Sequence, residues 1–290
     1  MAYQFRYTLS DIIRESKVIG SNAYVQLPTV GRTVSTEALK VNFVHKKLAE
    51  QLKKLWGTTT EYISTLFDSA PKQLRGSVTL GDTIRAAQNS PYLNDVELKM
   101  PVPEGLQSSY LEYVELLIGM ADAVDEFYDS GLIPFKTWVG SVLNNPEKIS
   151  TIAPGNHLKT FDPTQFIDLH AKSFKGHAVE VKYRQVIKRN SDWELLETKL
   201  NELLSKMSGE HSPQAVSETV RNLDTMLGEL IDGLVDPDKT YIAAPRNIDA
   251  LARHVANLAK MLEFYGMVCA SAEALAVAVE EAGRKYVSKH

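Results

Sequence analysis

The chain has 290 residues, of which 44% are hydrophobic and 23% charged, and its formal net charge is −4. This length can bury a substantial core, as one large domain or as two ordinary ones. The small net charge predicts neither a general nucleic-acid binder nor an acidic tail.

The single cysteine, Cys269, excludes a disulfide within the chain and fits a reducing compartment. Residues 1–20 carry several charges, so they cannot supply the uncharged core of a signal peptide. The longest apolar run, residues 274–279, is far shorter than the ~20 residues of a membrane span. We therefore expect a soluble protein without membrane contact, located in the cytoplasm, or in a virion if the protein is viral.

Residues 1–34 predict an extended N-terminal arm, with a short helix over 11–14 at most. The arm contains aromatic and aliphatic residues, but Pro28 and Gly31 interrupt it and no helical periodicity runs through it. A segment of this kind must lie on the body of the chain, add to a neighbouring subunit or stay mobile.

Residues 35–153 predict an N-terminal helical region. A helix begins at the capping residue Ser35 and ends at Gly57, and a second short helix covers 61–67. Residues 106–129 give the next strong helix, because their apolar residues recur at spacings of three and four. Pro146, Pro154 and Gly155 then mark a linker, which is the predicted domain boundary.

Residues 154–290 predict a C-terminal helical bundle. Valine-rich residues 178–187 supply at most one small β element, and a capping box at 191–194 starts the next helix. The long terminal helix, 245–288, carries apolar residues at alternating spacings of three and four, which form a heptad seam that other helices must bury. The first seam residues are Ile248, Leu251, Val255, Leu258, Leu262 and Tyr265. We predict an all-α multi-helix bundle with long heptad-patterned helices.

Motifs of known chemistry are missing from the sequence. It contains no glycine-rich phosphate loop and no nucleophile elbow, and one cysteine cannot build a Cys-x-x-Cys zinc site. His157, His170 and His177 fall in one segment beside carboxylates, which would suit a metal-dependent hydrolase, but their spacing matches no ligand motif. Surface histidines are the favoured interpretation. We therefore predict no catalytic residue, no metal and no cofactor.

Charge is segregated along the chain although the total is small. Residues 157–190 hold seven lysines and arginines against three carboxylates, and residues 191–240 hold eleven carboxylates against four basic residues. A basic segment can bind nucleic-acid phosphates. The residues that would do so are Lys172, Lys175, Lys182, Arg184, Lys188 and Arg189. The favoured interpretation is that the basic segment faces the acidic one, in the same chain or in the next subunit.

The chain begins with an irregular arm, continues with a middle part broken by prolines and ends with long heptad helices. In this organisation, though in no motif, it resembles helical virion-associated proteins of large tailed phages, which implies a virion or assembly component. We predict a non-enzymatic structural or assembly protein that self-associates, as a homo-oligomer, or docks into a larger protein complex. The alternatives are a nucleic-acid-associated protein and the metal-dependent hydrolase.

Overall fold

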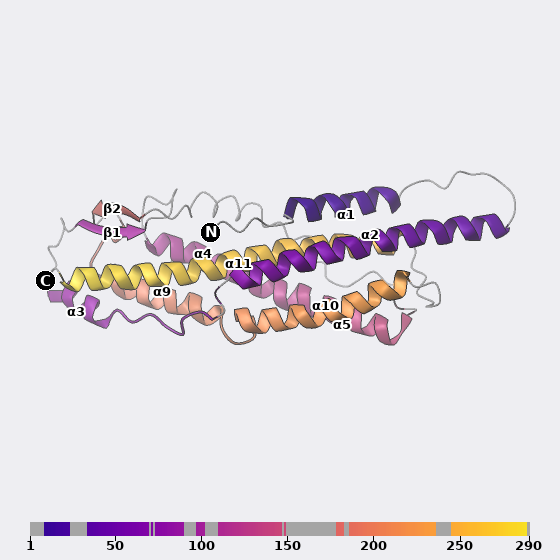
Figure 1. The fold of residues 1–290 in the computed structure, drawn as a ribbon. Coiled ribbons are helices and arrows are strands. Elements are labelled where there is room, and N and C mark those ends of the chain that lie inside the picture. The colour runs from indigo at the N-terminus through magenta and orange to yellow at the C-terminus, as the bar shows by residue number, and fades with distance from the viewer. Residues whose placement is uncertain are drawn as a thin grey trace. The chain divides into compact units, whose positions relative to one another are not determined.

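The computed structural model describes residues 9–23, 34–69, 71, 73–89, 97–101, 110–146, 148, 178–182, 186–235 and 245–288. Almost all of these residues are helical (Figure 1), so the prediction of an all-α helical bundle is confirmed. The chain forms two compact units: unit 1 comprises Met1–Ser69, Glu126–Phe161 and Ser217–Glu263, and unit 2 comprises Ala70–Asp125, Asp162–Val216 and Phe264–His290.

Both units are discontinuous in sequence, which differs from the predicted division near residue 153. Each unit takes residues from both sides of that position. The reason is the terminal helix α11 (Pro245–Ser288), which gives its first half to unit 1 and its second half to unit 2. Residues 146–155 belong to unit 1, and one boundary with unit 2 falls between Phe161 and Asp162.

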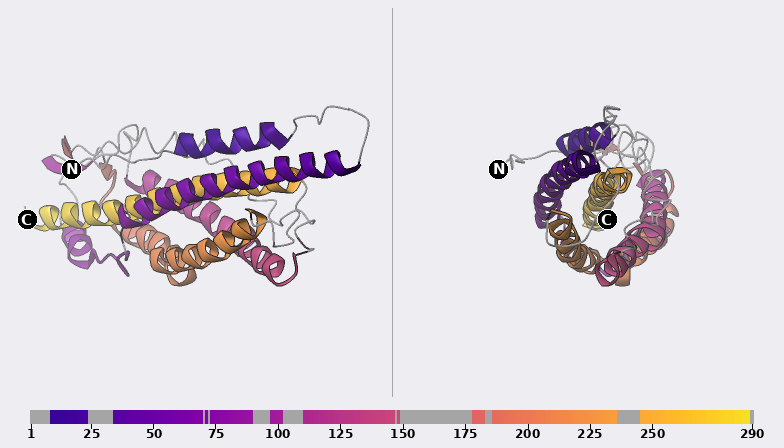
Figure 2. Two further views of the ribbon diagram at one scale, coloured as in Figure 1. Left: turned by 45° about the vertical axis from the view of Figure 1, so that its right-hand side comes forward. Right: turned by 90° about the vertical axis from the view of Figure 1, so that its right-hand side faces the viewer.

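Unit 1 contains α1 (Leu9–Ala23), α2 (Val34–Ser69), a short π-helix (Tyr128–Leu132) that continues into α5 (Ile133–Asn144), most of α10 (Pro213–Val235) and the first half of α11. In this unit α2, α5 and α10 lie around α11 (Figure 2). Side chains are buried on every face of this half of α11, as expected for a central helix.

The N-terminal arm differs from the prediction, because α1 is a helix of 15 residues inside the segment expected to be extended. Ile12 and Ser16, one helical turn apart, are buried, and α1 packs on α2. Glu15 pairs with Lys54 of α2 at 3.2 Å. This part of the arm therefore lies on α2 of its own chain. The periodicity of the arm alone did not predict this helix, because its apolar side chains pack on another segment.

The helix expected to end at Gly57 continues as α2 to Ser69. The hydroxyls of Thr58, Thr59 and Thr60 donate to the carbonyl oxygens of Lys54, Leu55 and Trp56, so the three threonines are satisfied inside the helix. A glycine inside a helix costs about 1 kcal/mol relative to alanine. Burial of the residues on both sides of Gly57 offsets that cost, and the helix does not stop.

Unit 2 contains α3 (Gly81–Asn89), nearly all of α4 (Tyr110–Phe127), α9 (Asp192–Lys206), a 3-10 turn (Gly209–His211) and the second half of α11. Gly209 has a φ of 61°, a backbone conformation that glycine adopts without strain, and it allows the turn after α9. The rings of Trp193 and Tyr286 meet in the core with centroids 5.8 Å apart.

Unit 2 also holds a two-stranded antiparallel sheet. Strand β2 (Ala178–Lys182) falls inside the predicted range 178–187 and pairs with β1 (Glu97–Pro101), with Glu97 opposite Lys182. The partner strand was not predicted, because the surrounding prolines indicated a broken segment. A proline is tolerated at the end of an edge strand, and both strands of a two-stranded sheet are edges.

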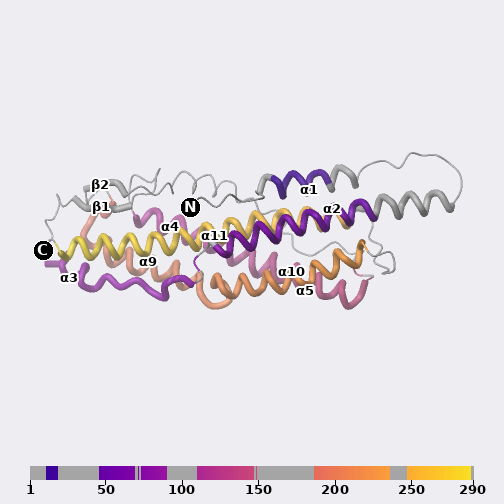
Figure 3. Tube along the Cα trace, in the orientation of Figure 1, coloured from indigo at the N-terminus to yellow at the C-terminus, as the bar shows by residue number. Residues whose placement is uncertain are grey.

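The predicted seam residues of α11 are all buried within the chain. Five of them lie in unit 1, namely Ile248, Leu251, Val255, Leu258 and Leu262, and Tyr265 lies in unit 2. Within the described residues, α11 is the one helix long and apolar enough to cross a membrane by length and composition, and 67% of its apolar 18-residue window is buried. A core helix of a soluble protein has the same features, so composition alone does not assign α11 to a membrane. The path of each described helix can be followed in Figure 3.

Candidate functional site

Most of the residues singled out for chemistry lie outside the described part of the chain. These are His157, His170, His177, Lys172, Lys175 and Arg184. Of the remaining basic residues, Lys182 is the last residue of β2, and Lys188 and Arg189 lie just before α9.

Lys188 is bound to a carboxylate of its own unit. Its Nζ lies 3.0 Å from Oε1 of Glu112 on α4, and both side chains are about half-exposed. The backbone N–H of Arg189 donates to the carboxylate of Asp192 at 2.9 Å. This end of the basic segment is therefore in contact with acidic side chains of the same chain.

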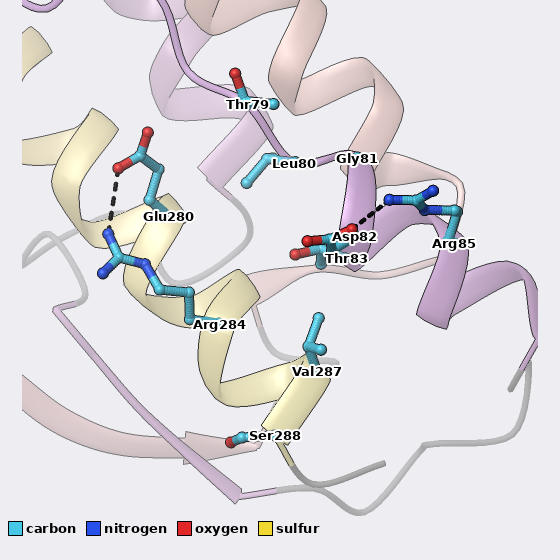
Figure 4. A pocket seen from close by; sticks show the side chains of 10 residues that line it. All are labelled: Thr79, Leu80, Gly81, Asp82, Thr83, Arg85, Glu280, Arg284, Val287 and Ser288. Atoms are coloured by element: carbon cyan, nitrogen blue, oxygen red, sulfur yellow. Dashed lines mark hydrogen bonds and ion pairs between the residues drawn. The ribbon is translucent and has the colours of Figure 1, made fainter.

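A pocket of about 480 Å³ lies in unit 2, between the start of α3 and the end of α11. Figure 4 shows Asp82 and Thr83 pointing toward α11 and Val287 pointing into the space between the two helices. Two ion pairs border it: Arg85 pairs with Asp82, and Arg284 pairs with Glu280 at 3.5 Å. The charged groups that line the pocket are two carboxylates and two guanidinium groups, which are paired within each helix.

Gly283 sets how closely α3 approaches α11 beside this pocket. A Cβ at this position would lie 2.6 Å from Oγ1 of Thr83 and 3.3 Å from Cδ2 of Leu80. A Cβ here would force the Thr83 hydroxyl to shift and would crowd Leu80, so glycine permits the approach without rearrangement.

A short extended segment leads into the pocket, and we call residues 73–80 the strap. Its Arg75 donates from Nε to Oε1 of Glu273 at 2.9 Å and from the backbone N–H to Oε2 at 3.1 Å. The same guanidinium also pairs with Glu280, two helical turns further along α11. The hydrogen bond that Arg75 donates to Glu273, together with the charge of Glu280, raises the pKa of Arg75 above its ordinary value.

The strap is also held by its backbone. Oδ1 of Asn201 on α9 accepts from the Val78 N–H at 2.8 Å, and Nδ2 of the same amide donates to the Val78 carbonyl at 3.2 Å. Val78 and Leu80 are buried, whereas Gly76, Ser77 and Thr79 are exposed. The strap therefore lies on α9 and α11 as a single extended layer.

A second polar cluster ties the turn after α9 to the rest of unit 2. Nδ1 of His211 lies 3.1 Å from Oδ1 of Asp125 on α4, and the His211 carbonyl accepts from the Tyr265 hydroxyl at 2.8 Å. Lys206 pairs with Asp122, one turn from Asp125. These contacts join three helices. The sequence did not indicate His211, because an isolated histidine in a turn carries no spacing signal.

Cys269 is buried in unit 2, and burial raises the pKa of its thiol to about 12. The thiol is therefore neutral at physiological pH, and a neutral thiol is a poor nucleophile. Among the described residues, no group of three or more histidine, cysteine, aspartate or glutamate side chains could hold a metal ion.

Comparison with known proteins does not assign this arrangement to a family. No protein-family model matches the chain, and neither a curated protein nor a solved structure matches it. Its function is therefore argued from its own residues.

Proposed function

We propose that this protein is a non-enzymatic structural or assembly protein that self-associates or docks into a larger complex. The observation that carries the proposal is α11, a helix of 44 residues that both units share. Buried apolar side chains occur along its whole length, from Ile248 to Tyr286. A continuous helix of this kind gives a protein a stiff internal support, which suits a structural role.

The polar groups in the described residues support the same proposal. Arg75 pairs with both Glu273 and Glu280, and His211 pairs with Asp125. Each of these ion pairs joins segments that are far apart in the sequence, and it holds them together within one unit. The charged residues of the pocket in Figure 4 are likewise matched with one another.

The test is native mass spectrometry of the protein purified from cells at low salt. The proposal predicts particles with masses that are multiples of 32.3 kDa, or a defined complex with other proteins. Nucleic acid that co-purifies and leaves at high salt would instead favour the nucleic-acid alternative, because phosphate contacts weaken steeply with salt. A single species of 32.3 kDa without a partner would contradict the proposal.

A further inference from the structure

The start of α3 carries hydrogen-bond donors that no described residue accepts. The first backbone hydrogen bond of the helix runs from the Ile84 N–H to the Leu80 carbonyl at 2.9 Å. The N–H groups of Gly81, Asp82 and Thr83 precede that bond, and they have no acceptor in the described part of the chain. A polar side chain at the preceding position commonly accepts from such groups, but that residue is Leu80, which has no polar atom in its side chain. All three residues line the pocket in Figure 4, so their donors lie in its wall.

Thr83 adds a buried hydroxyl to these donors. The residue is only 4% exposed, and its hydroxyl forms no hydrogen bond with the residues that the structure describes. Figure 4 shows its side chain pointing from α3 toward α11, where Oγ1 faces Gly283 beside the pocket. Buried polar groups are nearly always paired, because an unpaired one weakens the fold. The hydroxyl of Thr83 therefore indicates that the pocket holds a hydrogen-bonding ligand.

Two guanidinium groups stand beside these donors. Arg85 and Arg284 line the pocket, and both side chains are mostly exposed. Each pairs with a carboxylate one turn away in its own helix, Asp82 or Glu280. Ion pairs of surface side chains are weak, so each guanidinium can turn to an anion in the pocket at little cost. Glu280 keeps a counter-charge when Arg284 turns away, because Arg75 also pairs with it.

The carboxylate of Asp82 disfavours an anion in the pocket, but water weakens its effect. Its side chain is 79% exposed, and the field of an exposed charge is strongly reduced by water. The N–H groups and the Thr83 hydroxyl would bind an anion directly, and hydrogen bonds to a charged acceptor are about twice as strong as neutral ones. These donors therefore outweigh the one exposed carboxylate.

The pocket has room for more than an anion alone. Its volume of about 480 Å³ lies within the range of about 300–1,000 Å³ that is typical of small-molecule sites. Leu80 and Val287 supply apolar wall, and Val287 points into the space between the two helices in Figure 4. A ligand that fits both parts of the pocket has an anionic head and a compact apolar body.

We propose that this pocket binds a small phosphate monoester, with the phosphate at the start of α3 and the organic group against Leu80 and Val287. Phosphate suits the N-terminus of a helix, and its three terminal oxygens accept more hydrogen bonds than the two of a carboxylate. Thr83 and the N–H groups donate to these oxygens, and the two arginines neutralise the charge. The site goes beyond the proposed assembly role and does not depend on self-association, because all of its residues belong to unit 2.

Titration of the 290-residue chain with phenyl phosphate tests the proposal, with calorimetry for affinity and amide NMR spectra for location. The amide signals of Gly81, Asp82 and Thr83 should shift, and benzoate should bind at least about tenfold more weakly. Absence of binding at about 10 mM phenyl phosphate overturns the proposal. Signals that shift only outside the pocket, or benzoate that binds as tightly, also overturn it.

Thr83→Val is the decisive variant, because valine keeps the shape of threonine and removes only the hydroxyl. Its affinity for phenyl phosphate should fall at least about tenfold, as expected for a lost hydrogen bond to a charged group. Its melting temperature without ligand should equal or exceed that of the wild type, because no hydrogen bond within the chain is lost. Thr198→Val on α9 is the control, since that hydroxyl donates to the Glu194 carbonyl at 2.9 Å, away from the pocket.

Two results from the variants would overturn the proposal. One is a Thr83→Val protein that binds phenyl phosphate as tightly as the Thr198→Val control. The other is a Thr83→Val protein that melts well below this control, because its hydroxyl would then serve the fold rather than a ligand. Asp82→Asn gives the opposite sign, since loss of the opposing carboxylate should strengthen binding, and weaker binding in that variant would contradict an anion at this site.

Discussion

Glu263 shows how a single half-buried carboxyl makes unit 1 sensitive to pH. Burial raises the pKa of Glu263, although a hydrogen bond with Tyr62 partly opposes the shift. The neutral form is therefore favoured in the folded chain, and its contribution to stability is present below the ordinary glutamate pKa. That contribution is lost as the pH rises through the higher pKa of the folded state.

We expect Glu263→Gln to raise the melting temperature at pH 7, because glutamine keeps a hydrogen-bond acceptor for Tyr62 and removes the buried charge. The difference from the wild type should shrink as the pH falls to 4, where the glutamate is also neutral. Glu281→Gln, at an exposed position on the same helix, controls for the loss of a carboxylate. Equal differences at both pH values would contradict this explanation.

Gly283 gives a second prediction at the level of one residue. Gly283→Ala should destabilise unit 2 by about 1–3 kcal/mol, because overpacking against Thr83 and Leu80 outweighs the better helix propensity of alanine. Gly119→Ala on α4 is the matched control, since nothing lies within 4 Å of a Cβ there. That change should stabilise the protein by about 0.5–1 kcal/mol.

Urea unfolding of both glycine variants measures the difference. Adding Thr83→Ala to Gly283→Ala should recover part of the loss, because it removes the hydroxyl that the new Cβ would contact. If Gly283→Ala stabilised the protein as much as Gly119→Ala, then α3 would not approach α11 as closely as described.

At the scale of the elements, periodicity predicted the long helices because it depends only on neighbouring residues. It did not predict where α2 ends, since Gly57 is a local stop signal that packing overrides. It also missed α1, whose buried residues Ile12 and Ser16 pack on α2. The contact of Arg75 with Glu273 spans 198 residues, and nothing in the sequence indicates which distant charges will meet.

The apolar side chains of α11 give the prediction at this scale. Leu258 is fully buried in unit 1, so Leu258→Ala should lower the free energy of unfolding by about 2–5 kcal/mol. Leu258→Asp should prevent folding of the unit, because an unpaired charge would be buried. Glu281→Ala, on the exposed side of the same helix, should change stability by less than about 0.5 kcal/mol.

Chemical denaturation compares the three variants. A loss of stability for Leu258→Ala as small as that for Glu281→Ala would contradict the burial of α11.

At the scale of the whole molecule, the all-α class followed from composition and periodicity, but the units did not. Each unit is assembled from three separate stretches of chain. Prolines and glycines predict a domain boundary only where each domain is one continuous stretch of chain. Neither unit of this protein is continuous. The contacts under the strap were equally hidden, because Asn201 and Glu273 resemble ordinary polar residues of amphipathic helices until the strap is seen to lie on them.

Sedimentation equilibrium of the 290-residue chain over a hundredfold range of concentration tests the proposed self-association most directly. The expected result is an average mass that rises with concentration above the 32.3 kDa of one chain and approaches a whole multiple of it. A mass that stays at 32.3 kDa throughout, with no other protein co-purifying, would contradict the claim.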